Sequence, residues 1–224
     1  NTTSSATSYS WNFGDGSPVS NAVNPIHQYN LPGTYTVSLI ASQGSCADTL
    51  VQNSLINVYA SPLSSFSTSD VCMYDSVHFQ NASTMNGGVI TSYNWSFDDG
   101  LTSSVSSPSH FYTSPGTYNV TLSAISANCT DDTTITVNVN PNPAVNFASS
   151  TISACDSITI NFNNSTTGAA TYAWNFGDGN TSTVVSPSHL YAVEGTYSVL
   201  LTATSAEGCS ASKYAASMVI IKST

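Results

Sequence analysis

The sequence predicts an all-β fold in which three antiparallel β-sandwiches follow one another in an extended array. A block of residues around a tryptophan recurs three times, at intervals of roughly 80 residues, a period typical of small tandem domains rather than of solenoid repeats. Short runs alternate apolar and polar residues, as strands with one buried face do. No stretch shows a sustained period of 3.6 residues, so we expect no helix.

Each repeat contains two sequence blocks in the same order. The first reads Tyr-x-Trp-x-Phe followed by a Gly-Asp-Gly turn, except that Asp98 replaces the first glycine in the second repeat. The second block reads Pro-x-His-x-Tyr and continues as Gly-Thr-Tyr-x-Val-x-Leu. Tryptophan and phenylalanine two residues apart face the same side of a strand, so we expect both to be core residues. The three tryptophans are Trp11, Trp95 and Trp174.

The alternating runs and the prolines between them define the expected strands and domains. The strands are expected at 35–40, 76–79, 118–122, 135–139, 158–162, 197–201 and 218–221. Short joints with proline separate three domains, expected at 1–60, 61–141 and 142–224, and should be semi-rigid. The first domain has few residues before its tryptophan, so we expect it to be truncated at its N-terminus. Its missing strands would come from sequence before residue 1 or from a neighbouring chain.

The charge balance excludes several classes of partner. Only 6% of the residues are charged, the net charge is −10, and Lys213 and Lys222 are the only basic residues. Nucleic acids and anionic lipid surfaces both require a basic patch on the protein. No run of apolar residues is long enough for a membrane-spanning helix. We therefore expect no nucleic-acid partner and no membrane insertion, whereas divalent cations would suit this balance.

The five cysteines recur by repeat. Three lie late in their repeats (Cys46, Cys129 and Cys209) and two lie early (Cys72 and Cys155). This order predicts the disulfides Cys72–Cys129 and Cys155–Cys209, each within one domain, and leaves Cys46 unpaired because its partner would precede residue 1. Regular pairs indicate an oxidising, extracytoplasmic setting. The alternative that these are buried free thiols stays open.

Two residue types in the repeats are candidates for a metal site. Aspartates in the turns could bind a structural Ca²⁺, although one or two carboxylates lack the six or more oxygens that calcium prefers. The histidines at equivalent places belong to separate domains, so they cannot converge on one zinc ion or one catalytic triad. We expect each histidine ring to pack beside the Gly-Thr-Tyr strand. We expect no cofactor, and a structural Ca²⁺ bound by the turn aspartates stays an open alternative. These residues are Asp15, Asp98, Asp99 and Asp178, and His27, His110 and His189.

The two blocks together, at this spacing, resemble the PKD (polycystic kidney disease) domain family over essentially the whole chain. Asn12, Ser96 and Asn175 depart from the family pattern, which usually has aspartate after the tryptophan. The resemblance implies immunoglobulin-like sandwiches. The cysteine-flanked, Ser/Thr-rich style is similar to very large surface proteins of Bacteroidetes-type bacteria, which are exported by the type IX pathway and carry O-glycans on Asp-Ser/Thr motifs. It therefore implies O-glycosylation as an option at Thr49, Ser76, Thr133 and Ser157.

These observations favour a structural segment of an extracellular or cell-surface repeat protein: a stalk, adhesin or fibre that acts as a spacer or assembly module. The partners would be further repeats of the same polypeptide, neighbouring copies in a fibre or surface glycans. The alternative is an accessory module that binds polysaccharide or protein for a larger secreted enzyme. An enzyme is not expected, because the sequence offers no nucleophile–base pair, metal-ligand spacing or phosphate-binding loop.

Overall fold

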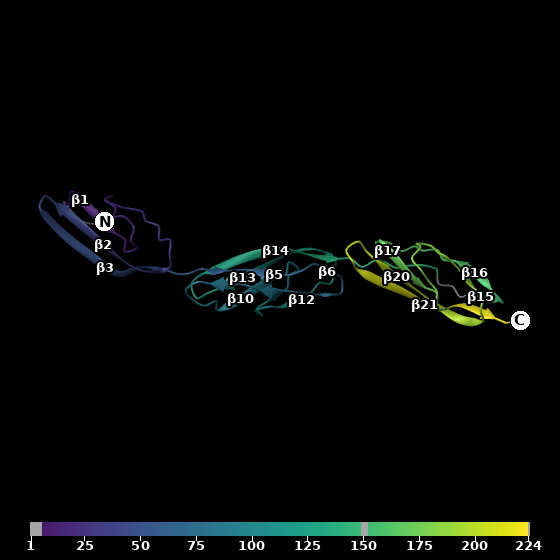
Figure 1. Ribbon diagram of the computed structural model, residues 1–224. Coiled ribbons are helices and arrows are strands. Elements are labelled where there is room, and N and C mark those ends of the chain that lie inside the picture. The colour runs from purple at the N-terminus through teal and green to yellow at the C-terminus, as the bar shows by residue number, and fades with distance from the viewer. Residues whose placement is uncertain (1–5, 149–151, 224) are drawn as a thin grey trace.

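The computed structural model describes residues 6–148 and 152–223 as three β-units joined end to end (Figure 1). We call them the first unit (6–60), the second unit (61–141) and the third unit (142–223). All elements in the described residues are strands, turns or loops, in agreement with the expected all-β array. The overall shape is an elongated rod with the first unit at one end and the third unit at the other (Figure 1).

The second and third units are sandwiches with the same topology. In the second unit the main sheet has the order β11-β10-β13-β14-β6, and in the third unit the order β15-β21-β20-β17-β18. The strands of the first of these sheets are β6 (Val71–Cys72), β10 (Ser92–Ser96), β11 (Thr102–Ser103), β13 (Gly116–Ile125) and β14 (Thr130–Asn140). Those of the second are β15 (Ile152–Cys155), β17 (Thr171–Asn175), β18 (Thr181–Ser182), β20 (Gly195–Thr204) and β21 (Ser210–Lys222).

Shorter strand pairs form the opposing layer. They are β4 (Pro62–Leu63) with β9 (Thr84–Met85), β5 (Phe66–Ser67) with β8 (Gln80–Asn81), β7 (Ser76–His78) with β12 (Ser109–Phe111), and β16 (Ile158–Asn161) with β19 (Ser188–Tyr191). The core lies between the two layers, where Trp95 and Trp174 are 0% and 1% exposed. Each tryptophan packs among phenylalanines, Phe79 and Phe66 in the second unit. Large aromatic rings thus fill these small sandwiches.

The first unit has only one layer among the described residues. Its sheet has the order β1-β2-β3, with β1 (Ser8–Asn12), β2 (Gly33–Gln43) and β3 (Cys46–Val58). In the described part of the chain, no strand lies beside the end of β3, where β6 and β15 pair with β14 and β21 in the other units. As a result, Trp11 is only half-buried, and apolar residues such as Leu50, Val51 and Leu55 on β3 are more than half exposed.

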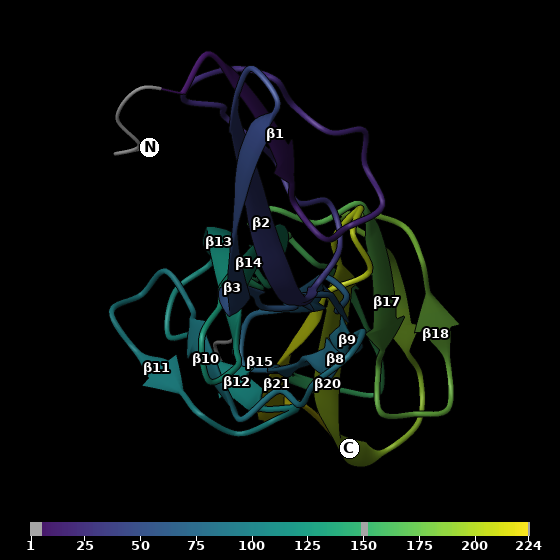
Figure 2. The same ribbon diagram turned by 90° about the vertical axis from the view of Figure 1, so that its left-hand side faces the viewer.

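Successive units are rotated about the long axis of the rod. Figure 2 looks along that axis, and the equivalent edge strands β11 and β18 project to opposite sides. Equivalent faces of the second and third units therefore do not line up into one continuous surface.

Candidate functional site

The repeated histidine and aspartate form a hydrogen bond in each unit. In all three units the histidine Nε2 lies 2.7 Å from Oδ2 of the turn aspartate. The histidine ring stacks in parallel on the phenylalanine of the first block, with centroids 3.9–4.1 Å apart. The following tyrosine packs edge-on against the histidine, and its hydroxyl donates to the carbonyl oxygen of that phenylalanine. The pairs are His27–Asp15, His110–Asp99 and His189–Asp178.

This cluster shifts the pKa of the aspartates downward. The Ser17 hydroxyl, together with His27, lowers the pKa of Asp15 to about 2. Burial raises the pKa of Asp99, but the hydrogen bonds from His110 and from the Leu101 amide outweigh it, so the pKa lies below its ordinary value. The pKa of Asp178 is lowered in the same way. Each aspartate is thus held ionised by its hydrogen bonds, one of which comes from the histidine that fastens the turn to the sheet.

Each cluster fastens its turn to the sheet of its own unit. The histidine and the aspartate of each cluster are hydrogen-bonded to each other, and the three clusters lie in separate units. No group of three or more histidine, cysteine or acidic residues suited to a metal occurs in the described ranges. The sequence placed the histidines beside the Gly-Thr-Tyr strand but missed their aspartate partners. The nearly constant spacing of 11 or 12 residues between the turn aspartate and the histidine was the available signal.

Asp98 makes a side-chain hydrogen bond that the glycines at the equivalent position of the other two units cannot make. Its backbone has a φ of 66°, and its Oδ2 accepts a hydrogen bond of 2.9 Å from the Asn119 amide. The glycines at this position in the other units would place a Cβ 2.3–2.4 Å from a carbonyl oxygen of the facing strand. In those two units the facing strand has an irregular register at that residue, whereas β13 and β14 pair without interruption. In the first and third units, a glycine at this position therefore occurs together with an irregular register in the strand that faces it.

An open hollow lies on the exposed face of the first unit. It has a volume of about 350 Å³ and is lined by Trp11, Phe13, His27, Tyr29 and Leu55, with other residues. In the second unit, the place over the tryptophan is taken by Phe66 and Phe79 from the opposing layer. The hollow is thus the uncovered core side of the first sheet.

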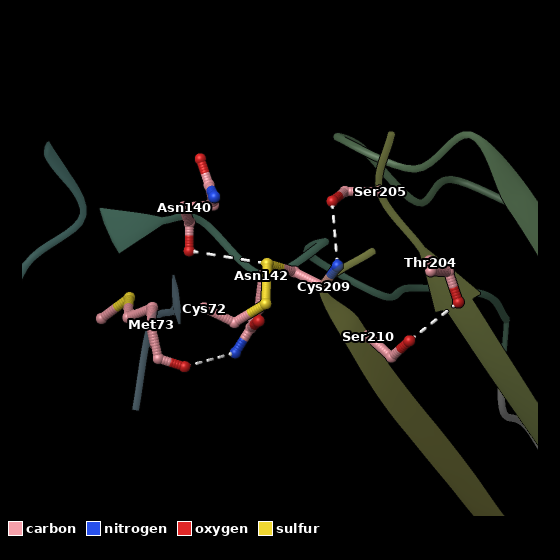
Figure 3. Close-up of a disulfide and its surroundings, with 8 residues drawn as sticks. All are labelled: Cys72, Met73, Asn140, Asn142, Thr204, Ser205, Cys209 and Ser210. Atoms are coloured by element: carbon pink, nitrogen blue, oxygen red, sulfur yellow. Dashed lines mark hydrogen bonds between the residues drawn. A yellow bond between two sulfur atoms is a disulfide. The ribbon is translucent and has the colours of Figure 1, made fainter. Parts of the chain in front are cut away.

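A disulfide joins the second unit to the third (Figure 3). It links Cys72 to Cys209, with the two Cα atoms 5.5 Å apart and a sequence separation of 137. Cys72 ends β6 at one tip of the second unit, and Cys209 lies in the hairpin before β21 at the near tip of the third unit. The Asn142 side chain, in the linker between these units, donates to the Met73 carbonyl at 3.0 Å. A covalent bond and a linker hydrogen bond therefore both cross this joint.

The structure corrects the expected disulfides Cys72–Cys129 and Cys155–Cys209. Cys129 and Cys155 are free thiols, and so is Cys46. The reason is the length of the last strand of each unit. Cys129 lies directly before β14, whereas Cys72 pairs in register with Asn140 at the far end of the same strand. Eleven residues of strand hold these two cysteines on the order of 35 Å apart, far beyond the reach of a disulfide.

The expected glycan acceptors differ in accessibility. Thr49, Ser76 and Ser157 are exposed. The Thr133 hydroxyl, in contrast, is half-buried and hydrogen-bonds to the Ser64 carbonyl oxygen at 2.8 Å, within the tip of the second unit. Thr133 is therefore engaged in local packing, while the other three residues are exposed.

Comparison with known proteins identifies relatives of these units. The family model of the PKD domain matches residues 1–58, 60–141 and 138–220. A microbial collagenase of Vibrio alginolyticus is 43% identical over 81 residues, which are 35% of this chain and 10% of the collagenase. Collagenase ColA of Bacillus cereus is 54% identical over 37 residues, or 16% of this chain and 4% of that enzyme. The chain thus spans a tenth or less of the length of these curated relatives.

Among solved structures, the PKD1 domain of Vibrio anguillarum Epp is 33% identical and covers 36% of this chain and 95% of its own, with a TM-score of 0.34. The PKD1 domain of the Vibrio cholerae metalloprotease PrtV is also 33% identical, covering 36% of this chain and 98% of its own, with a TM-score of 0.34. No helix in the described ranges is long and apolar enough to cross a membrane.

Proposed function

This chain belongs to the PKD domain family along almost all of its length, and on that premise we propose that it is a structural segment of an extracellular repeat protein. In this role it spaces or connects other parts of a stalk, adhesin or fibre. PKD domains are non-catalytic accessory modules, so activity is not expected from the units themselves. The observation that carries the proposal is the end-to-end array with a disulfide across a joint.

The geometry of the array supports a spacer more than a receptor. The longest strands of the main sheets, β13, β14, β20 and β21, run for 10–13 residues, so each unit is on the order of 35 Å long and three units give a rod of about 100 Å. The rotation between units interrupts any shared flat face (Figure 2). The exposed aromatic residues Tyr59, Tyr74, Phe111 and Tyr214 lie on different strands or loops of the described chain.

An extracellular or cell-surface location is part of the proposal. Disulfides persist in oxidising compartments and are rare in the cytosol. Microbial collagenases are among the relatives, and enzymes that act on collagen work outside the cell. We propose further repeats of the same polypeptide as the direct partners, with neighbouring copies or surface glycans as contacts along the rod. The net charge of −10 supports neither nucleic acid nor insertion into a membrane.

Solution scattering of the oxidised chain tests the spacer role. We expect an elongated particle with a maximum dimension on the order of 100 Å. The matched control is Cys72→Ser, which removes the disulfide at the joint and should broaden the distribution of interunit angles without folding the units onto one another. A compact, near-spherical particle in the wild-type chain would refute the proposal.

A second candidate is an accessory module that docks a larger enzyme onto its polysaccharide or protein substrate. The similarity to a segment of two collagenases favours it. Co-sedimentation of the chain with insoluble collagen, chitin and cellulose tests this candidate. Saturable binding that is lost on substitution of exposed Tyr74 or Tyr214 would favour docking over spacing. Retention on none of the three would leave the spacer role as the better account.

A further inference from the structure

Two free cysteines occupy the same structural positions as the two bonded ones. Cys129 lies in the hairpin of the second unit where Cys209 lies in the third, and Cys155 ends β15 where Cys72 ends β6. The described residues therefore contain one closed disulfide joint and, in Cys129 and Cys155, two open halves that match it; the third free cysteine, Cys46, begins β3 in the first unit.

The hairpin positions agree in their hydrogen bonds. The Ser126 amide donates to the Cys129 carbonyl at 2.8 Å, and the Cys129 amide donates to the Ser126 hydroxyl at 3.1 Å. In the third unit, the Ser205 amide donates to the Cys209 carbonyl at 2.8 Å, and the Cys209 amide donates to the Ser205 hydroxyl at 3.3 Å. A serine thus holds each cysteine at the tip that faces the preceding unit.

The strand-end positions agree in their register. Cys72 lies opposite Asn140 in a parallel pair at the end of β14, and Cys155 lies opposite Lys222 in a parallel pair at the end of β21. The amide that follows each cysteine donates to the last strand, Met73 to the Asn140 carbonyl and Asp156 to the Lys222 carbonyl. Both cysteines therefore sit at the tip that faces the next unit along the array.

The thiols differ from their bonded counterparts in burial. Cys209 is 0% exposed in the closed joint, whereas Cys129 is half-buried and Cys155 is exposed. Within the part of the chain that the structure describes, no strand with a cysteine lies beside the end of β3, the place from which Cys129 would be reached. Neither can bond within its own unit, because a full strand length separates the two tips.

We propose that Cys129 and Cys155 are interaction sites for adjoining PKD repeats, each forming the same interunit disulfide as Cys72–Cys209. Cys129 accepts a cysteine from a strand that pairs in parallel with the end of β3, and Cys155 bonds to the hairpin cysteine of a repeat that follows β21. Two thiols lose two protons and two electrons to form each bond. The oxidant is a small disulfide such as glutathione disulfide, which is reduced to two thiols by exchange. This inference holds whether the array acts as a spacer or as a docking module.

A chimera that joins both open halves in one molecule tests the proposal. Ile221 occupies in the third unit the register position that Val58 occupies in the first. Residues 59–140 are therefore appended after Ile221, so that a second copy of the second unit follows the third. Cys46→Ser and Cys129→Ser in the original part, with Cys72→Ser in the appended copy, leave four cysteines: Cys72, Cys155, Cys209 and the appended Cys129.

The chimera is folded with a glutathione redox pair, digested without reduction and mapped by mass spectrometry. We expect Cys72–Cys209 and Cys155 bonded to the appended Cys129, with no free thiol. The matched control Cys155→Ser should keep Cys72–Cys209 and show one free thiol on the appended copy. Bonds within units, or a free Cys155 beside an intact Cys72–Cys209, would overturn the proposal.

A second chimera tests the same bond with a different appended unit, in case the appended copy of the second unit does not fold. It carries residues 140–224 after Ile221, and its appended hairpin cysteine, the copy of Cys209, should bond to Cys155. Formation of the Cys155 bond in either chimera supports the proposal for that half of the joint. If neither chimera forms Cys72–Cys209, the joint from which the inference starts does not exist in solution and the proposal fails with it.

Discussion

The first and second units contain the same aromatic, histidine and aspartate cluster, but only the second encloses its tryptophan. His27 and His110 make the same contacts to aspartate and phenylalanine. Trp95 is nevertheless 0% exposed, while Trp11 is half-buried above an open hollow. The difference is the opposing layer, which residues 62–85 contribute to in the second unit. The motif therefore fixes the turn, whereas the residues before it make the core.

The largest expected difference between these units concerns their tryptophans. Trp95→Ala should reduce the free energy of unfolding of the second unit by about 3–5 kcal/mol, because it leaves a large cavity in a closed core. Trp11→Ala should cost the first unit about 1–2 kcal/mol, since its ring is already partly in solvent. Unit-resolved hydrogen exchange under denaturant measures both, with Trp174→Ala as a control that should match Trp95→Ala. Equal losses at Trp11 and Trp95 would contradict this account.

The next effect compares the third unit with the second at the first position of the turn. Gly177→Asp should destabilise the third unit by about 2–3 kcal/mol, because its Cβ would meet the Ser198 carbonyl oxygen at 2.4 Å. The second unit already carries Asp98 at the equivalent position. Thermal unfolding monitored by calorimetry measures the cost. A neutral outcome would show that the strand irregularity at Ser198 adjusts to a side chain.

A smaller effect tests the hydrogen bond between histidine and aspartate that the units share. His110→Gln should cost the second unit about 1–2 kcal/mol near pH 7, because it removes a hydrogen bond to an ionised carboxylate. The pKa of Asp99 is lowered in the folded state, so its contribution is present above the unfolded pKa of about 3.9 and is lost as the pH falls through the folded value. The variant should therefore lose less stability than wild type between about pH 5 and pH 2.

Urea unfolding across that pH range checks the prediction. His78→Gln is the matched control, because His78 is exposed and its Nδ1 forms a hydrogen bond with the Ser109 hydroxyl rather than with a carboxylate. The His78→Gln variant should have the same free energy of unfolding as wild type at pH 7 and should lose the same amount of it between about pH 5 and pH 2. If His110→Gln loses as much stability as wild type between about pH 5 and pH 2, the hydrogen bond between His110 and Asp99 does not account for the loss of stability in acid.

The smallest effect is expected from Asp98→Gly. The change removes the hydrogen bond to the Asn119 amide but also relieves a side chain held at a φ of 66°. These contributions oppose each other, so the stability of the second unit should change by less than about 1 kcal/mol. Calorimetry of this variant beside Gly177→Asp completes the comparison. A loss above about 2 kcal/mol would show that the Asp98 hydrogen bond is required by the regular pairing of β13 with β14.

The fold could be predicted because the repeat shows it directly. Alternation in 118–122 and 197–201 marks central strands, and the recurring tryptophan marks the core. The disulfide could not be assigned from the cysteine order alone, because a period of roughly 80 residues fits bonds within one unit and bonds between neighbours equally well. The distinction depends on strand length: Cys129 and Asn140 enclose one long strand, which puts early and late cysteines at opposite tips.

The Asp–His pairs were missed for a different reason. The histidines were read as packing residues, which they are, since each stacks on a phenylalanine. Their polar partner lies 11 or 12 residues earlier, across the turn. A strand pattern records only which side of a strand a residue faces, so a contact between a turn and a later strand leaves no periodic signal.

The Cys72–Cys209 bond changes how this rod would respond to tension. A force applied to the two ends of the chain is transmitted through the backbone to Cys72 and through the disulfide to Cys209. The segment between the two cysteines therefore carries no load. Most of the second and third units lies in that segment. Without the bond, unfolding this segment of 137 residues would lengthen the chain by up to about 450 Å. The disulfide thus prevents extension of the segment between the two cysteines, while the first unit, residues 61–71 and β21 stay in the load path.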